Sequence, residues 1–152
     1  MTVHRLTSRR FPACDGEGAR LYGGRWNSRG RPAVYTAGTQ SLAALEILAH
    51  AAALGDAYVV VRIEIPDGVL IEGIPVSELS SWATETTRSM GDAWLTRQTS
   101  AVLRVPSIVV PVEFNFVLNP AHQDFHRLVI ADPEPFRFDP RLLKRFVGSW
   151  YG

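Results

Sequence analysis

The run AYVVVRIEI at residues 57–65 constrains the fold of this chain more than any other feature. A β-strand would place four of its β-branched side chains on one face, namely Val59, Val61, Ile63 and Ile65. Such side chains favour extended backbone because they pack well on a pleated surface. We therefore expect a sheet with one face buried against the rest of the protein.

Strand composition recurs in three other parts of the chain: residues 33–37, residues 101–118, where Pro106 and Pro111 cut the pattern, and residues 126–138. Helical patterns are confined to three segments: residues 41–53, 89–97 and 140–146. Gly55 is placed to end the first helix, and Ser89 is expected to cap the second, with Asp92 in its first turn. Because strands outnumber helices, the sequence predicts an α+β domain with a mixed sheet.

The length and composition predict one domain over residues 1–152, since prolines and glycines are scattered as turn residues without a linker or a repeat. We find no signal-peptide pattern and no stretch near the roughly 20 apolar residues that a membrane span needs. The lone Cys14 has no partner for an intrachain disulfide, and no paired-cysteine zinc spacing is present. These observations predict a cytoplasmic protein without a membrane segment.

The formal net charge of +1 hides an uneven distribution of charge. Residues 1–31 carry seven arginines against only Asp15 and Glu17, whereas the rest of the chain is net acidic. A concentrated positive field favours an anionic ligand. Nucleic acid would also suit a basic segment, but the nearly neutral total favours a small phosphorylated ligand instead.

Several standard catalytic motifs are missing from the sequence. We find no Walker loop, no nucleophile elbow around a serine and no zinc-protease helix. The segment GEGARL begins at Gly16 but has Leu21 where a dinucleotide-binding motif needs its third glycine. A Rossmann domain is therefore disfavoured.

The segment GGRWNSRG at residues 23–30 is the first candidate for ligand binding. Arg25 sits between a glycine pair and Trp26–Asn27, so backbone and guanidinium could both approach a phosphate. Alternatively, Arg25 is a surface arginine in a glycine-rich turn and Trp26 a core residue. Tyr35 lies on the next strand, where its ring could stack on a flat ligand or fill a half-buried strand position.

Glu46 is informative because it interrupts an apolar helix between Leu45 and Ile47. A carboxylate is costly to bury without a partner, so a functional role is one explanation. The other is an exposed ion pair, since Glu46 and His50 stand four residues apart on one helix face. Two possible ligands with this spacing do not predict a metal site.

Four polar positions follow in the strand-rich region. Ser107 comes after a proline, so its hydroxyl could point into a cleft and bind a ribose or phosphate, or be structural. Asn115 lies in a strand that leads to an Asn-Pro turn containing Asn119 and His122, where asparagine is common for backbone reasons. None of these residues indicates function by itself.

Taken in order, GGRWN with Gly30, the following tyrosine, the helical glutamate and LRVPSIVVPVEFNFVLNPAH closely resemble the RES-domain family. The three residues that give this family its name correspond to Arg25, Glu46 and Ser107. The resemblance covers most of the chain, with the motif-bearing core at about residues 20–143. The resemblance is specific because all of these motifs occur in the same order, and no single motif would identify the family.

The resemblance implies a fold similar to that of ADP-ribosyltransferases and an NAD-depleting toxin of a bacterial toxin–antitoxin pair, acting by hydrolysis or phosphorolysis. The implied partner is an antitoxin with an Xre-type helix-turn-helix region, which would carry any DNA binding. The implied substrate is NAD, with inorganic phosphate as a conceivable co-substrate and no further cofactor or metal. The sequence leaves a homodimer open.

A mechanism can be assigned to these residues as a hypothesis. Arg25 would hold the NAD diphosphate, Tyr35 would pack against nicotinamide, and Glu46 would stabilise the oxocarbenium charge of the ribose. The remaining substrate contacts are expected from Trp26, Asn27, Ser107 and Asn115. Two alternatives stay open: a protein ADP-ribosyltransferase with largely the same active residues, and a noncatalytic nucleic-acid-binding module that uses the arginine-rich start.

Overall fold

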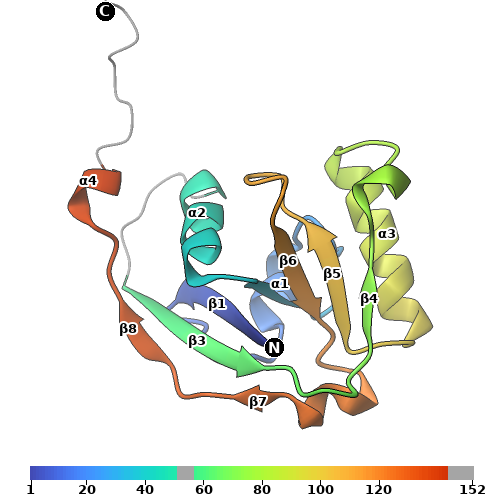
Figure 1. Ribbon diagram of the computed structural model, residues 1–152, viewed down its shortest axis with the longest axis horizontal. Helices are drawn as coiled ribbons and strands as arrows, with labels where there is room; N and C mark the ends of the chain where they lie inside the picture. The colour runs from blue at the N-terminus through green and yellow to red at the C-terminus, as the bar shows by residue number, and fades with distance from the viewer. Residues whose placement is uncertain (51–56, 144–152) are drawn as a thin grey trace, which may run out of the picture.

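A computed structural model describes residues 1–50 and 57–143 of the chain. Its centre is a curled sheet of eight strands in the order β4-β5-β6-β2-β1-β3-β7, with β8 also paired to β3 (Figure 1). The strands are β1 (Thr2–Ser8), β2 (Val34–Ala37), β3 (Tyr58–Glu64), β4 (Ile71–Gly73), β5 (Val102–Pro106), β6 (Phe114–Leu118), β7 (Val129–Ile130) and β8 (Glu134–Phe136). The predicted α+β class is confirmed.

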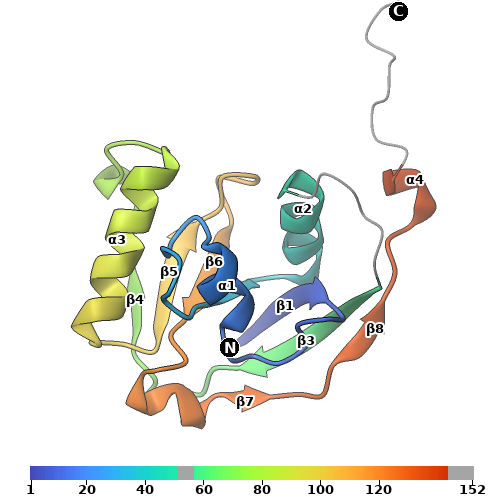
Figure 2. The same cartoon turned by 180° about the vertical axis from the view of Figure 1, so that it is seen from behind.

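Four α-helices and two short 3-10 turns accompany the sheet in the described ranges. The helices are α1 (Glu17–Tyr22), α2 (Gln40–His50), α3 (Thr84–Arg97) and α4 (Pro140–Leu143), and the 3-10 turns are η1 (Val76–Glu78) and η2 (Gln123–Arg127). Both views place α3 beside β4 and β5 at one end of the sheet and α2 near β1 towards the other end (Figures 1 and 2).

The β-branched run forms β3, as its alternation predicts. β3 pairs antiparallel with β1 over seven residue pairs, from Thr2–Glu64 to Ser8–Tyr58. Val61 and Ile63 are fully buried in one hydrophobic cluster with Val3 of β1 and Leu118 of β6. Burial of this face is the main source of stability for the centre of the sheet.

The sheet is weakly joined between β1 and β2. A single residue pair, His4 with Ala37, connects these strands, whereas β2 and β6 share four pairs. β1 and β2 therefore diverge on either side of this pair and divide the sheet into two halves. The cores differ accordingly: α2 packs on Leu6 and Val60 in one cluster, and α3 packs on Leu103 in another.

The start of α3 differs from the prediction. The helix begins at Thr84, so Ser89 lies inside it and caps nothing, and Asp92 lies beyond its first turn. Asp92 instead accepts hydrogen bonds from the backbone N–H and the hydroxyl of Ser28. Ser28 belongs to the loop of residues 23–30, which we call the GGRWN loop. A long-range contact to this loop thus determines the position of the Asp92 carboxylate, which local cap rules could not reveal.

Two predicted boundaries extend beyond the described residues. For the helix predicted at 41–53 the structure describes 40–50, and the predicted end at Gly55 lies outside the described residues. For the terminal turn predicted at 140–146 it describes 140–143. Within the described ranges, no helix is both long and apolar enough to cross a membrane.

Candidate active site

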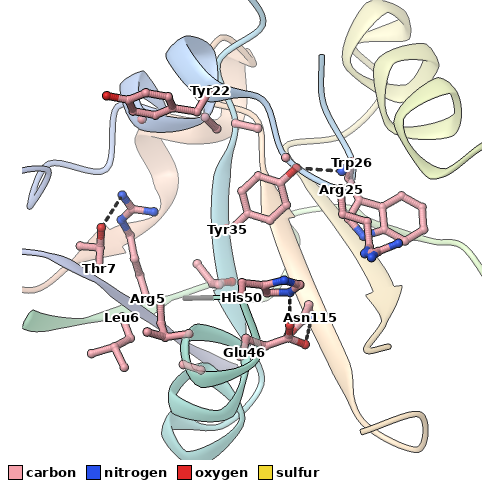
Figure 3. Close-up of a pocket in the computed structure, with 18 of the residues that line it drawn as sticks. Arg5, Leu6, Thr7, Tyr22, Arg25, Trp26, Tyr35, Glu46, His50 and Asn115 are labelled. Atoms are coloured by element: carbon pink, nitrogen blue, oxygen red, sulfur yellow. Dashed lines mark hydrogen bonds and ion pairs between the residues drawn. The ribbon is translucent and has the colours of Figure 1, made fainter. Parts of the chain in front are cut away.

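A cavity of about 680 Å³ opens where β1 and β2 diverge. Its walls come from β1, α1, the GGRWN loop, β2, α2 and the start of α3, so segments distant in sequence meet there. Five of the predicted site residues line it: Arg25, Trp26, Tyr35, Glu46 and Asn115 (Figure 3). The split in the sheet therefore creates the site.

Glu46 is the one carboxylate among the described residues that line the cavity. Its Oε1 accepts hydrogen bonds from Ser107 Oγ and Asn115 Nδ2, each at 2.7 Å. Its Oε2 lies 3.3 Å from His50 Nε2, and only 19% of the side chain is exposed. Glu46 does pair with His50, but it is not a simple exposed ion pair, because Ser107, just after β5, and Asn115 of β6 also hold this carboxylate.

Of the two interpretations of Ser107, its contacts favour the structural one. Its side chain is fully buried and is not among the cavity-lining residues. Its hydroxyl donates a hydrogen bond to Glu46. The same oxygen accepts the backbone N–H groups of Val109 and Val110. With its hydrogen-bonding capacity used in this way, Ser107 positions Glu46 rather than contacting a ribose or phosphate directly.

Asn115 combines support of Glu46 with a free acceptor. Its Nδ2 donates to Glu46, while its Oδ1 is buried and has no hydrogen-bond partner in the described structure. An unpaired buried acceptor is costly, so a ligand donor at this wall of the cavity would be favoured. Asn115 therefore remains a candidate for direct substrate contact.

Tyr35 faces the cavity with its ring, and its hydroxyl is used for structure (Figure 3). The hydroxyl accepts the N–H of Trp26 at 2.9 Å and donates to Asn27 Oδ1 at 2.7 Å. Burial raises the pKa of the phenol well above its ordinary value, so it stays protonated. The absence of a side chain at Gly24 leaves room for this hydroxyl, because a Cβ there would lie 2.5 Å from the Tyr35 hydroxyl oxygen.

Because the Tyr35 ring faces the cavity and its hydroxyl serves the structure, Tyr35→Phe should affect stability more than turnover. Loss of the hydroxyl leaves the Trp26 N–H and the Asn27 amide oxygen without their partner, so the free energy of unfolding should fall by about 1–3 kcal/mol. The ring remains, so turnover of the folded protein should stay within a few-fold of wild type. Denaturant unfolding and steady-state kinetics would check both; a large loss of turnover at unchanged stability would assign the hydroxyl to the chemistry.

Asn27 and Trp26 depart from the prediction that both contact substrate. Asn27 is fully buried, is absent from the cavity wall, and donates from Nδ2 to the carbonyls of Ala19 and Arg31. Asn27 therefore stabilises the GGRWN loop through hydrogen bonds to its neighbouring backbone. Trp26 borders the cavity but is only 3% exposed and packs in the core with Trp94, which agrees with the alternative of a core residue.

Arg25 and Arg88 bring positive charge to the same end of the cavity. Arg25 donates from Nη1 to the carbonyl of Trp82 at 2.8 Å, and its buried Nε has no partner in the described structure. Arg88 of α3 donates from Nε to the carbonyl of Gly24 at 2.7 Å. Both guanidinium groups keep donors available for an anion.

Sequence reasoning missed Arg88 and Arg5 as members of the site. The available signal for Arg5 was the excess of arginine in residues 1–31, but β1 itself was not predicted. Arg88 gave no signal, because it appears as one polar residue among several on a helix. No group of three His, Cys, Asp or Glu residues suited to a metal ion occurs in residues 1–50 or 57–143.

Comparison with known proteins identifies the family of this chain. Residues 2–139 match the family model described as the RES domain. The protein called Toxin Res of Yersinia enterocolitica is 39% identical over 93% of this chain and 99% of its own length. The chain therefore belongs to the RES-domain family.

One further relative and one solved structure extend the comparison. The Prs ADP-ribosylating toxin of a Sphingobium species is 36% identical, over 86% of each chain. The crystal structure of the Mycobacterium tuberculosis MbcT–MbcA toxin–antitoxin complex contains a chain with a TM-score of 0.71 and 22% identity, covering 89% of this chain and 83% of that one. That similarity supports the mixed α/β fold with its curled sheet.

Proposed function

We propose that this protein is an enzyme that binds NAD in the cavity and cleaves its nicotinamide–ribose bond. The observation that carries the proposal is Glu46, a single carboxylate held by Ser107 and Asn115 in a cavity that three arginines also line. The arginines suit the diphosphate of NAD, and the carboxylate suits positive charge that develops on a sugar.

Cleavage of the nicotinamide–ribose bond requires few catalytic groups beyond this arrangement. Nicotinamide leaves a cationic pyridinium as a neutral base, so no acid is needed to protonate the leaving group. One carboxylate then suffices, unlike the paired acids of most glycosidases. Glu46 would face the ribose and stabilise the oxocarbenium charge, while Ser107 and Asn115 keep the carboxylate from rotating away.

The remaining assignments follow the geometry of the walls. Arg25, with Arg88 beside it, would bind the diphosphate, and the ring of Tyr35 would pack against nicotinamide. The acceptor of the ADP-ribose moiety would be water or inorganic phosphate. NAD would thus be a substrate, and no bound cofactor is part of the proposal.

We further propose that the protein is the toxin of a toxin–antitoxin pair that acts in the cytoplasm. The support is the name Toxin Res of relatives at 39% and 37% identity, and the toxin–antitoxin complex in which the similar fold occurs. The proposed partner is an Xre-type helix-turn-helix antitoxin. Coexpression and copurification with the product of a neighbouring gene of that kind would test the pairing, and a failure to copurify would contradict it.

Arg25→Ala should weaken NAD binding by at least about tenfold, because a guanidinium bound to phosphate is a strong charge-assisted contact. Arg29→Ala is the matched control, since Arg29 lies in the same loop but is exposed and off the cavity wall. The KM for NAD measures the effect. Equal KM values for the two variants would remove Arg25 from the binding site.

A second candidate function is transfer of ADP-ribose to a protein. The specific observation in its favour is the name of the Sphingobium relative, a Prs ADP-ribosylating toxin. The same cavity residues would serve, because both reactions break the same bond. NAD labelled in its adenine would separate them: label in a small product supports hydrolysis or phosphorolysis, and label bound to a macromolecule supports transfer.

A further inference from the structure

Arg5 is the feature of the cavity that the proposed assignments leave unexplained. It projects from β1 on the opposite side of Tyr35 from Arg25, and lines the cavity together with Thr7 (Figure 3). Arg5 and Thr7 are two positions apart on one strand, so both side chains lie on the same face. The cavity therefore has a second basic wall, separate from the GGRWN loop.

The guanidinium of Arg5 is poorly compensated for a partly buried charge. Nη2 lies 3.3 Å from both Thr7 Oγ1 and the carbonyl oxygen of Phe11, two neutral acceptors at long distance. Its Nε is buried without a partner, and no carboxylate of residues 1–50 or 57–143 forms an ion pair with it. Charges withdrawn from solvent are normally paired, so an anion that enters the cavity would be favoured beside this guanidinium.

Electrostatics agree with this geometry. Burial lowers the pKa of Arg5 from its ordinary value, and the nearby Cys14 and Asp15 offset only part of that cost. The cavity as a whole contains Arg5, Arg25 and Arg88 against the single carboxylate of Glu46. One diphosphate bound by Arg25 and Arg88 would leave the charge of Arg5 without a counter-ion.

We propose that Arg5 and Thr7 form a second phosphate subsite, in which the guanidinium and the threonine hydroxyl both donate to one phosphoryl group. The inference rests on the proposed function, because the subsite serves the same cavity. Two sources can supply this group. One is free inorganic phosphate, which would then be positioned as the acceptor. The other is one of the two phosphoryl groups of the NAD diphosphate, in which case Arg25 and Arg88 would bind only the other one.

Calorimetric titration tests the subsite without relying on turnover. Inorganic phosphate is titrated into the wild-type protein and into Arg5→Met, which keeps the length of the side chain and removes its charge. NAD is titrated into the same proteins carrying Glu46→Gln, so that little substrate is consumed. Arg9→Met, at an exposed arginine that follows β1, is the matched control.

We expect Arg5→Met to lose at least about tenfold in affinity for one of the two probes, and Arg9→Met to lose none. Loss for inorganic phosphate alone identifies a free-phosphate subsite, and loss for NAD alone identifies a dinucleotide subsite. Thr7→Val should weaken the same probe by a smaller factor. The proposal is overturned if Arg5→Met binds both probes with unchanged affinity. Because the titration measures only binding, a protein that fails to cleave NAD would not overturn the subsite.

Thermal unfolding distinguishes a ligand-binding arginine from a structural one. In phosphate-free buffer, Arg5→Met should unfold at or above the wild-type temperature, because it removes a poorly paired, partly buried charge. Phosphate or NAD should raise the unfolding temperature of the wild type more than that of the variant. A marked fall in the unfolding temperature of Arg5→Met without ligand would instead make Arg5 a structural residue and overturn the proposal.

Discussion

Replacement of Glu46 by glutamine is expected to slow nicotinamide release by roughly a hundred- to a thousandfold. A preorganised charge opposite a developing cation is worth about 3–4 kcal/mol, which corresponds to that range of rates. Glutamine has nearly the shape of glutamate and keeps an oxygen that can accept from Ser107 and Asn115. The loss should therefore appear in kcat, with little change in KM for NAD or in stability.

The matched control is Glu85→Gln, at an exposed position in the first turn of α3. It removes the same charge from the protein and leaves the cavity untouched, so turnover should remain at the wild-type level. Glu46→Gln with turnover near wild type would sink the assignment of Glu46. Quenched-flow or steady-state release of nicotinamide measures both variants.

Gly91→Ala is expected to destabilise the fold strongly, although alanine is the better helix former. A Cβ at Gly91 would lie 1.8 Å from the carbonyl oxygen of Trp26 and 2.6 Å from its carbon, which are backbone atoms that cannot turn aside. Overpacking of this kind costs about 1–3 kcal/mol or more. To relieve it, α3 must move away from the GGRWN loop, which would also displace Arg25 from the cavity.

Gly18→Ala is the matched control for this substitution. Gly18 lies inside α1, and the nearest atom to an added Cβ is a Phe11 ring carbon at 3.9 Å. Helix propensity alone predicts that either substitution stabilises by about 0.5–1 kcal/mol. We expect that result for Gly18→Ala and the opposite sign for Gly91→Ala in denaturant unfolding; equal gains in both would show that α3 does not depend on this close approach.

The sequence predicted those elements whose pattern is local. Alternation of β-branched residues identified β3, and the short strand at 33–37 was also found. β1 and α1 were missed because the polar residues of the arginine-rich start hide their periodicity. The three-residue β4 was missed because Gly73 and the nearby Pro75 resemble turn residues.

Residues of the site were easier to predict than their roles. The family resemblance pointed to Arg25, Glu46 and Ser107, and two of them line the cavity while the third holds Glu46. The difference between contacting a ligand and supporting another residue depends on contacts across about 60 residues of chain, as for Ser107 with Glu46. No local pattern encodes such a contact, which is also why the buried position of Asn27 could not be predicted.

The most direct test of the account is nicotinamide release from NAD by the purified protein, freed of any bound partner. We predict release of free nicotinamide in step with NAD loss, and its dependence on added phosphate would separate phosphorolysis from hydrolysis. NAD that stays intact in both buffers, with a folded protein and no labelled macromolecule, would contradict the proposal that this cavity cleaves NAD.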